Sequence, residues 1–232
     1  MERAADANVP LWCDDAATRT LAAAFGVASF GTPELVEYLR SIGQIADAMA
    51  NAIDAALIRG YAVGVQYRPE VWDLSWSFEG DAPGGVAQAI LLCGPQFATE
   101  KMQLVARAMQ RAVDQPQSLR DWSSVGARYV SEIAGEDEAA IDNLGVFLRT
   151  VLNASWIAPH QLDFVADGIR SVAGDRWYPA LRKAIRHHWR ELRSTAPVDI
   201  VAAHILGRIS GLRAEDRQLA LEIVLRDGET EI

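Results

Sequence analysis

The sequence has few cysteines, few lysines and no long apolar run. Its two cysteines, Cys13 and Cys93, lie far apart and outside any CxxC or Cys/His spacing, so we expect neither a disulfide framework nor a zinc site. Only Lys101 and Lys183 are lysines. No apolar stretch approaches the roughly 20 residues that a membrane-spanning helix needs, and the acidic start lacks a signal peptide's apolar core. We therefore expect a cytoplasmic protein without a membrane partner.

Catalytic and cofactor-binding motifs are also missing. Ser123, Ser124 and Ser155 lack the GxSxG context of a hydrolase nucleophile, and the glycines of DAPGG are not followed by the Lys-Ser/Thr of a phosphate loop. The adjacent His187 and His188 diverge by about 100° on a helix, so both do not readily bind one ion. We expect no catalytic residue, no metal and no cofactor. An active site assembled from distant residues leaves no such motif in a sequence, so an enzyme stays an alternative.

Charge is distributed unevenly along an acidic chain. Lys and Arg total 22 against 31 Asp and Glu, a formal net charge of −9. Residues 1–142 carry 10 basic and 20 acidic side chains, whereas residues 143–232 carry 12 and 11. Phosphate contact needs accumulated positive charge, so nucleic-acid binding would be confined to the second part. Half of the 232 residues are hydrophobic and seven are Trp, a globular composition that favours self-association as a homo-oligomer.

Helix signals frame the first part of the chain. Asp14 or Asp15 can cap a short helix, and Thr32 followed by Pro33 is typical of a helix start. A longer helix with apolar residues at helical spacing is expected to end at Gly60.

Between about residues 60 and 93 the apolar period changes from helical to alternating. Two stretches alternate apolar and polar residues, which predicts half-buried strands. VAQAILLCG reads as a third, more buried strand. The sequence therefore predicts a small three-stranded meander. The alternating residues are Tyr61, Val63, Val65 and Tyr67, then Trp72, Leu74, Trp76 and Phe78.

The remainder of the chain has helical spacing throughout. An acidic break, GEDE, coincides with the change in charge and suggests a boundary at 135–140. We expect an α+β, predominantly helical fold, with an α+β domain over 1–138 and a C-terminal helical bundle over 139–232. The same features are compatible with one continuous domain.

The stretch from Val86 to Trp122 resembles the strand–Pro–helix segment of enzyme IIA domains of the fructose–mannitol phosphotransferase family. Ile90, Gly94 and Pro95 match the strand end, and the apolar face that begins at Met102 matches the helix. The resemblance covers about 40 residues and consists of packing positions. It implies the fold without the reaction, because the family's phosphorylated histidine precedes this segment and the present chain has no histidine before residue 160.

The sharpest functional feature is a basic amphipathic helix, LRKAIRHHWRELR, at 181–193. Its apolar side carries Leu181, Ile185 and Trp189 among others. The other side carries a cationic stripe, which we interpret as the contact site for a macromolecular protein partner of a non-catalytic regulatory protein. The same stripe could instead be a solvated surface paired with acids of its own chain. The residues of this stripe are Arg182, Lys183, Arg186, Arg190 and Arg193.

Two other functions stay open. The basic helix, taken over residues 176–193, could bind nucleic acid or a nucleotide phosphate. A pocket between the expected sheet and the helices, lined by the aromatic residues of 72–78, could bind a small molecule or support an enzyme.

Overall fold

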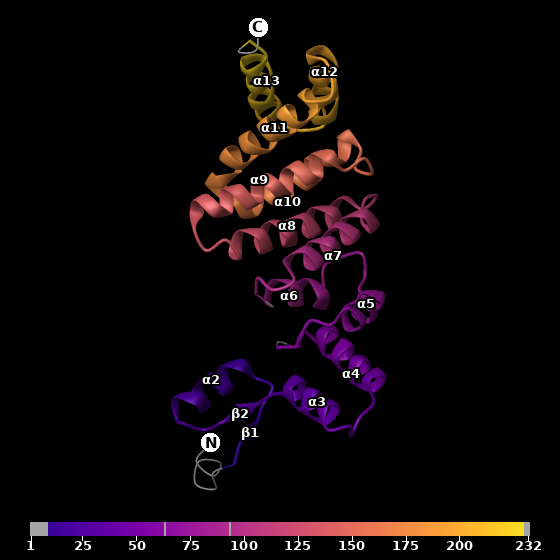
Figure 1. Ribbon diagram of the computed structural model, residues 1–232, viewed down its shortest axis with the longest axis vertical. Coiled ribbons are helices and arrows are strands. Elements are labelled where there is room, and N and C mark those ends of the chain that lie inside the picture. The colour runs from indigo at the N-terminus through magenta and orange to yellow at the C-terminus, as the bar shows by residue number, and fades with distance from the viewer. Residues whose placement is uncertain (1–8, 63, 93, 230–232) are drawn as a thin grey trace. The chain divides into compact units, whose positions relative to one another are not determined.

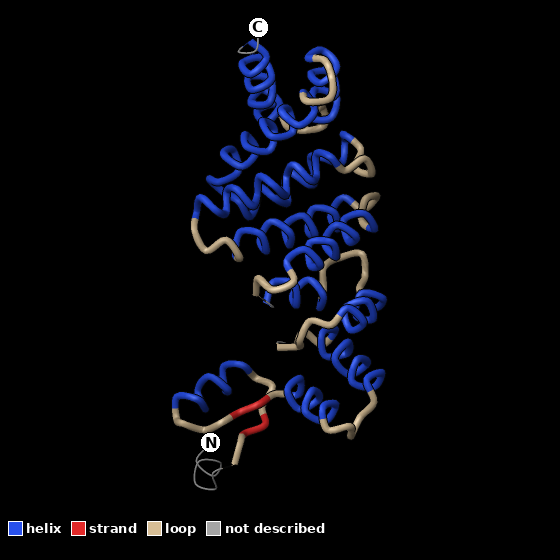
Figure 2. The backbone as a smooth tube through the Cα atoms, in the orientation of Figure 1, coloured by secondary structure: helices blue, strands red, loops and turns tan. Residues whose placement is uncertain are grey.

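The computed structural model of the chain is predominantly helical (Figure 1). It describes residues 9–62, 64–92 and 94–229. The chain forms two compact units, Met1–Phe97 and Ala98–Ile232. Figure 2 shows the helices in blue and two short strands in red.

The first unit begins with the two strands, which pair in parallel with Leu11 opposite Ser29 and Trp12 opposite Phe30. Asp15 caps the first helix by accepting a 2.8 Å hydrogen bond from the Thr18 amide, as the sequence indicates. In chain order the elements are β1 (Leu11–Trp12), α2 (Ala16–Ala24), β2 (Ser29–Phe30), α3 (Thr32–Ser41), α4 (Asp47–Arg59), α5 (Pro69–Phe78) and α6 (Gly85–Leu92).

The expected three-stranded meander is wrong. Residues 64–68 are loop, and the stretch 72–78 lies in helix α5, which starts at Pro69. Proline at the first helical position has its backbone angle already set for a helix. The buried residues Val71, Trp72 and Ser75 follow helical spacing, whereas Phe78 is 56% exposed. The alternation of large residues therefore hid a helical face. Val63 and Cys93, which belong to the predicted strands, lie outside the described residues.

The third expected strand is helix α6. Gly85 lies so close to α4 that a Cβ there would be 2.1 Å from the Ile58 carbonyl oxygen. Val86, Ala87, Ala89 and Ile90 are buried, and a short apolar run of this kind does not distinguish a strand from a buried helix. The segment matched to the strand end of the enzyme IIA family is consequently helical here up to Leu92.

A charged cluster joins three helices of the first unit. Asp54 of α4 is 4% exposed and pairs with Arg68, which precedes α5. Arg68 also lies 3.4 Å from Glu37 of α3. Burial raises the pKa of Asp54, although the guanidinium of Arg68 opposes this effect. These ion pairs join α3, α4 and the start of α5, whose contact the sequence pattern does not predict.

The second unit is built from helices that pack with their second neighbours along the chain. The main contacts join α8 with α10 and α9 with α11, and α13 lies against α11 (Figure 1). The helices are α7 (Ala98–Arg111), α8 (Pro116–Glu132), α9 (Asp137–Asn153), α10 (Leu162–Ala173), α11 (Trp177–Arg193), α12 (Val198–Ile209) and α13 (Ala214–Glu229), with short 3-10 turns at Pro159–Gln161 and Gly174–Arg176.

One glycine allows α8 and α10 to approach closely. A Cβ at Gly168 would lie 2.2 Å from the Arg120 carbonyl oxygen. Ser124 of α8 donates a 3.0 Å hydrogen bond to the Gly168 carbonyl at the same crossing. Backbone therefore packs on backbone here, which no larger side chain at residue 168 would allow.

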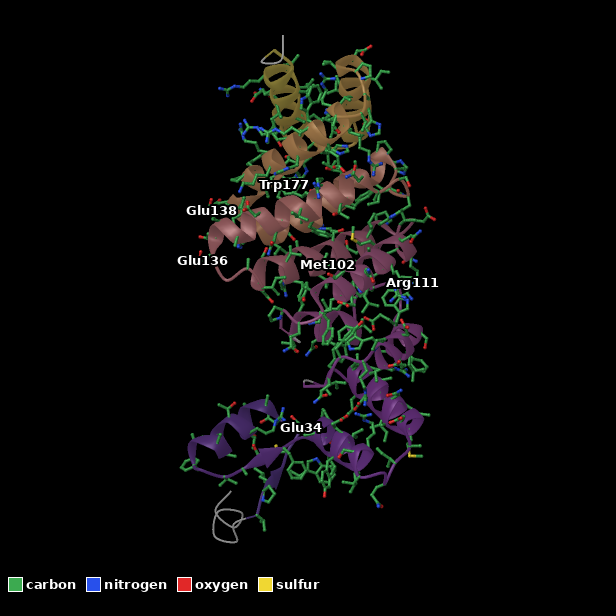
Figure 3. The ribbon with its side chains drawn as sticks, in the orientation of Figure 1. Glu34, Met102, Arg111, Glu136, Glu138 and Trp177 are labelled. Atoms are coloured by element: carbon green, nitrogen blue, oxygen red, sulfur yellow. The ribbon has the colours of Figure 1, made fainter. Side chains whose placement is uncertain are left out.

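The acidic break lies inside the second unit. Glu136 and Glu138, exposed and directed outward in Figure 3, stand at the turn where α8 gives way to α9. These two helices pack against each other. The unit boundary lies instead between Phe97 and Ala98. Across the described ranges, no helix is long and apolar enough to cross a membrane.

Candidate anion-binding groove

Helix α11 has one buried face and one polar face, as its sequence predicts. Its buried side packs against α9 and α13. Apolar residues at helical spacing explain this placement, because burying them removes a large area from water. The buried residues are Trp177, Ala180, Leu181, Ala184, Ile185, His188 and Trp189.

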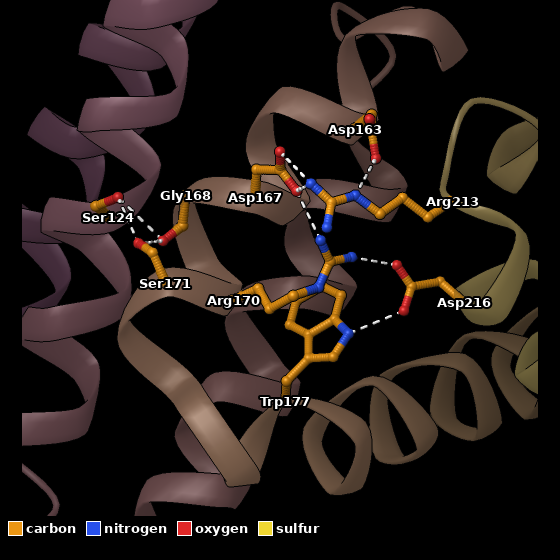
Figure 4. A network of polar contacts seen from close by, with 9 residues as sticks. All are labelled: Ser124, Asp163, Asp167, Gly168, Arg170, Ser171, Trp177, Arg213 and Asp216. Carbon is orange, nitrogen blue, oxygen red and sulfur yellow. Dashed lines mark hydrogen bonds and ion pairs between the residues drawn. The ribbon is translucent and has the colours of Figure 1, made fainter.

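A polar network anchors the start of α11. Asp216 of α13 is 1% exposed and accepts a 2.9 Å hydrogen bond from the Trp177 indole. Arg170 of α10 pairs with Asp216 and Asp167, and its guanidinium lies 4.8 Å from the Trp177 ring centre (Figure 4). Arg213 adds a 2.6 Å ion pair to Asp167. These contacts fix α11 relative to α10 and α13.

An open groove of about 420 Å³ lies along α9 and α11. At Gly145 the two helices come close, because a Cβ there would be 3.3 Å from the Lys183 Cβ and 3.4 Å from the Ala180 carbonyl oxygen. Val146 is 57% exposed and supplies apolar surface. The groove is lined by Asp142, Gly145, Val146 and Arg149 of α9 and by Lys183, Arg186, His187 and Arg190 of α11.

The lining has an excess of positive charge. Among the described lining residues, four side chains are Arg or Lys and one, Asp142, is a carboxylate. Asp142 pairs with Lys183. Arg149 lies 3.9 Å from Glu191, which is the outer limit of an ion pair. Exposed pairs of this kind contribute only about 0–1 kcal/mol, so a ligand can displace them at small cost.

Arg186 and Arg190 differ from the arginines that hold the fold together. Arg208 donates to four carbonyl groups at the end of α9, including 2.9 Å to Leu152, and Arg170 pairs with two carboxylates. Within the described residues, Arg186 and Arg190 form no ion pair and no side-chain hydrogen bond, and the Nε of Arg186 is buried without a partner. Buried polar groups are normally satisfied, so the unpartnered Nε of Arg186 is unusual, and the exposed Arg190 is open to a ligand.

The structure divides the five residues of the predicted stripe. Lys183, Arg186 and Arg190 line the groove. Arg182, which directly precedes Lys183, is exposed and does not belong to the lining. Arg193 is half-buried and donates a 2.8 Å hydrogen bond to the Ala196 carbonyl, just past the end of α11. Lys183 pairs with Asp142, a carboxylate of the same unit.

Sequence reasoning missed the contribution of α9. Arg149 and Asp142 lie far from the basic helix in the chain and reach the groove only because α9 packs on α11. The available signal was weak: Arg149 follows Gly145 by one turn in α9.

The histidines do not form a metal site in the described part of the chain. His188 is 2% exposed, and neither of its ring nitrogens has a hydrogen-bond partner there. Its ring centre lies 6.0 Å from that of His204. No group of three or more His, Cys, Asp or Glu among the described residues is placed to hold a metal ion.

The first unit contains a second open pocket, of about 360 Å³. Asp14 and Arg19 are its charged lining residues, beside Tyr61. Asp14 already accepts hydrogen bonds from Thr32, which hold the pKa of its carboxyl below the ordinary range. Arg19 already pairs with Glu34 at 2.9 Å. This pocket therefore presents few unmet polar groups.

Comparisons with protein families, with curated proteins and with solved structures found no match for this chain. The resemblance to enzyme IIA domains stays a prediction.

Proposed function

We propose that the chain is a non-catalytic interaction protein that binds an acidic segment of a protein partner in the groove between α9 and α11. The observation that carries the proposal is the unpaired state of Arg186 and Arg190 beside Arg149 and Lys183, within the residues that the structure describes. Charge complementarity of this kind steers association and favours one partner over others.

The chemistry of the lining supports binding rather than catalysis. The groove contains no hydroxyl and no thiol, among its described lining residues, that could act as a nucleophile. Among the described lining residues, Asp142, His187 and Lys183 are of the types that act as general acids or bases, and Asp142 and Lys183 engage each other. General acid–base work needs two such groups poised around a reacting centre.

A protein partner is favoured over nucleic acid. The chain carries a formal charge of −9, and its groove collects four cations in one place. Non-specific nucleic-acid binding depends on phosphate contacts along an extended strand, and an acidic protein repels the rest of that strand. We place the interaction in the cytoplasm, where the free thiol of Cys13 would stay reduced.

The test uses two matched double variants. Arg186→Glu with Arg190→Glu reverses two groove charges, and Arg128→Glu with Arg182→Glu reverses two exposed charges outside the groove. We expect a partner captured from the source cells by the native chain to be retained by the second variant and lost by the first. Equal capture by both variants would contradict the role of the groove. Circular-dichroism melting should show that both variants are folded.

A further inference from the structure

The unmet hydrogen-bond donors of the groove indicate which anion it accepts. A guanidinium offers five N–H donors in a planar fork. Arg208 and Arg170 donate these N–H groups to carbonyl and carboxylate oxygens of the fold. Within the described residues, the side chains of Arg186 and Arg190 donate to no acceptor. A ligand that satisfies two such forks must present several oxygens. A carboxylate has two, and a phosphomonoester has three terminal oxygens.

The charge of the lining favours the same ligand. Among the described lining residues, four cationic side chains face one carboxylate, which leaves an excess of three positive charges from these five groups. A carboxylate neutralises one of these charges, whereas a phosphomonoester carries about −1.5 to −2 at neutral pH. Arg is also the side chain best suited to bidentate contact with phosphate.

The apolar part of the groove favours a phosphate that is carried by a larger molecule. Val146 is 57% exposed beside Gly145, which has no side chain. Free phosphate would leave this surface in water, whereas a peptide segment would cover it and gain roughly 25 cal/mol per Å² of apolar area buried. The groove, at about 420 Å³, also exceeds the size of a single phosphate group and is in the range of sites for larger ligands.

We therefore propose that the groove between α9 and α11 is a phosphopeptide site, in which Arg186 and Arg190, with Arg149 of α9, hold a phosphorylated side chain of a protein partner. The assignment rests on the proposed function and makes it conditional: phosphorylation of the partner would switch the interaction on.

The probes for the test are peptide libraries in which one central residue is fixed and the flanking residues are random. One library fixes phosphoserine, a second fixes glutamate, and further arms use free phosphoserine and an oligothymidylate. Fluorescence anisotropy measures the dissociation constant of each for the native chain. We expect the phosphoserine library to bind at least about tenfold more tightly than each of the other probes.

Two variants locate the binding. Arg186→Gln removes a groove charge, and Arg182→Gln removes the same charge one turn away, outside the groove. We expect the first to weaken phosphoserine binding at least about tenfold and the second to change it less than about twofold. Melting temperatures serve as the control for folding.

Each alternative outcome overturns a stated part of the assignment. Equal binding of the glutamate and phosphoserine libraries would refute the phosphopeptide site and leave the acidic-partner function standing. Equal binding of free phosphoserine would indicate a small-molecule site, and tightest binding of oligothymidylate would indicate a nucleic-acid site. No binding of either library would refute both the site and the proposed function.

Discussion

Acid should destabilise the second unit through His188, and the size of the effect follows from its surroundings. Burial, more than the charge of the neighbouring His204, lowers the pKa of His188 below its ordinary value near 6.5. Arg208 and Arg149 lower this pKa further, and Glu191 opposes them. With no hydrogen-bond partner for either ring nitrogen within the described residues, no hydrogen bond there compensates a proton added to the folded state.

The direction in which pH changes the free energy of unfolding follows from proton uptake by the folded and the unfolded chain. Above about pH 6.5 the imidazole is neutral in both the folded and the unfolded chain, so the full stability is present. As the pH falls below that value, the imidazole of His188 takes up a proton in the unfolded chain but not in the folded chain. The free energy of unfolding then drops by up to about 1 kcal/mol between about pH 7.5 and pH 5.5. The loss ends once the pH passes below the pKa of His188 in the folded chain.

The assay is urea unfolding at several pH values in that range, for the native chain, His188→Leu and His187→Gln. His187 is the exposed neighbour on the same helix, which makes it the matched control. The native chain and His187→Gln should lose stability in acid, and His188→Leu should lose about 1 kcal/mol less. Any contribution of Asp54, whose pKa burial raises, is common to all three chains and cancels in the differences. An identical acid dependence in His188→Leu would refute the reasoning.

Three further perturbations test the packing of the second unit. Gly168→Ala places a methyl group 2.2 Å from the Arg120 carbonyl oxygen, so urea unfolding should show a loss of at least about 1–3 kcal/mol; an unchanged midpoint would mean that the helices do not cross this closely. Asp216→Ala leaves the half-buried guanidinium of Arg170 and the buried Trp177 indole without this acceptor, and calorimetry should show a loss of about 1–3 kcal/mol, with an unchanged stability contradicting the network. Arg208→Met removes donors from four carbonyl groups near the end of α9. Amide hydrogen exchange in the last turn of α9 should then become about tenfold faster or more, and unchanged protection would show that these hydrogen bonds from Arg208 are dispensable.

Helix boundaries were readable from sequence wherever local chemistry sets them. Helix α3 begins at Thr32 with Pro33 in its first turn, and Gly60 follows the end of α4. The N-cap of α3 is Gly31, however, and the Thr32 hydroxyl donates to Asp14 rather than capping the helix. The first helix is capped by Asp15, as its sequence indicates. These signals act over a few residues and need no tertiary contact.

The prediction of strands was wrong because large residues can alternate with polar residues along a helix as well as along a strand. In α5 the proline start at Pro69 and the hydrogen bond from the Ser75 hydroxyl to the Val71 carbonyl act locally, yet the pattern of Trp and Phe suggested a period of two. The buried positions obey the helical period. Size alone was a poor guide to which residues face the core.

Only the α11 side of the groove has a signal in the sequence. The sequence locates Lys183, Arg186 and Arg190 on one side of α11, but the pairing of α11 with α9 is long-range and leaves no local signal. Arg149 could therefore not be assigned to the site in advance. Self-association, which the apolar composition favours, stays a prediction that analytical ultracentrifugation would test.

The availability of the groove arginines can be measured through their reactivity toward phenylglyoxal, mapped by mass spectrometry on the folded native chain. We expect Arg186 and Arg190, with no partner among the described residues, to react at rates near that of the exposed Arg182, whereas Arg170 and Arg208 should be protected. Protection of Arg186 and Arg190 equal to that of Arg208 would contradict the proposed function, because the groove would then have no free guanidinium to offer.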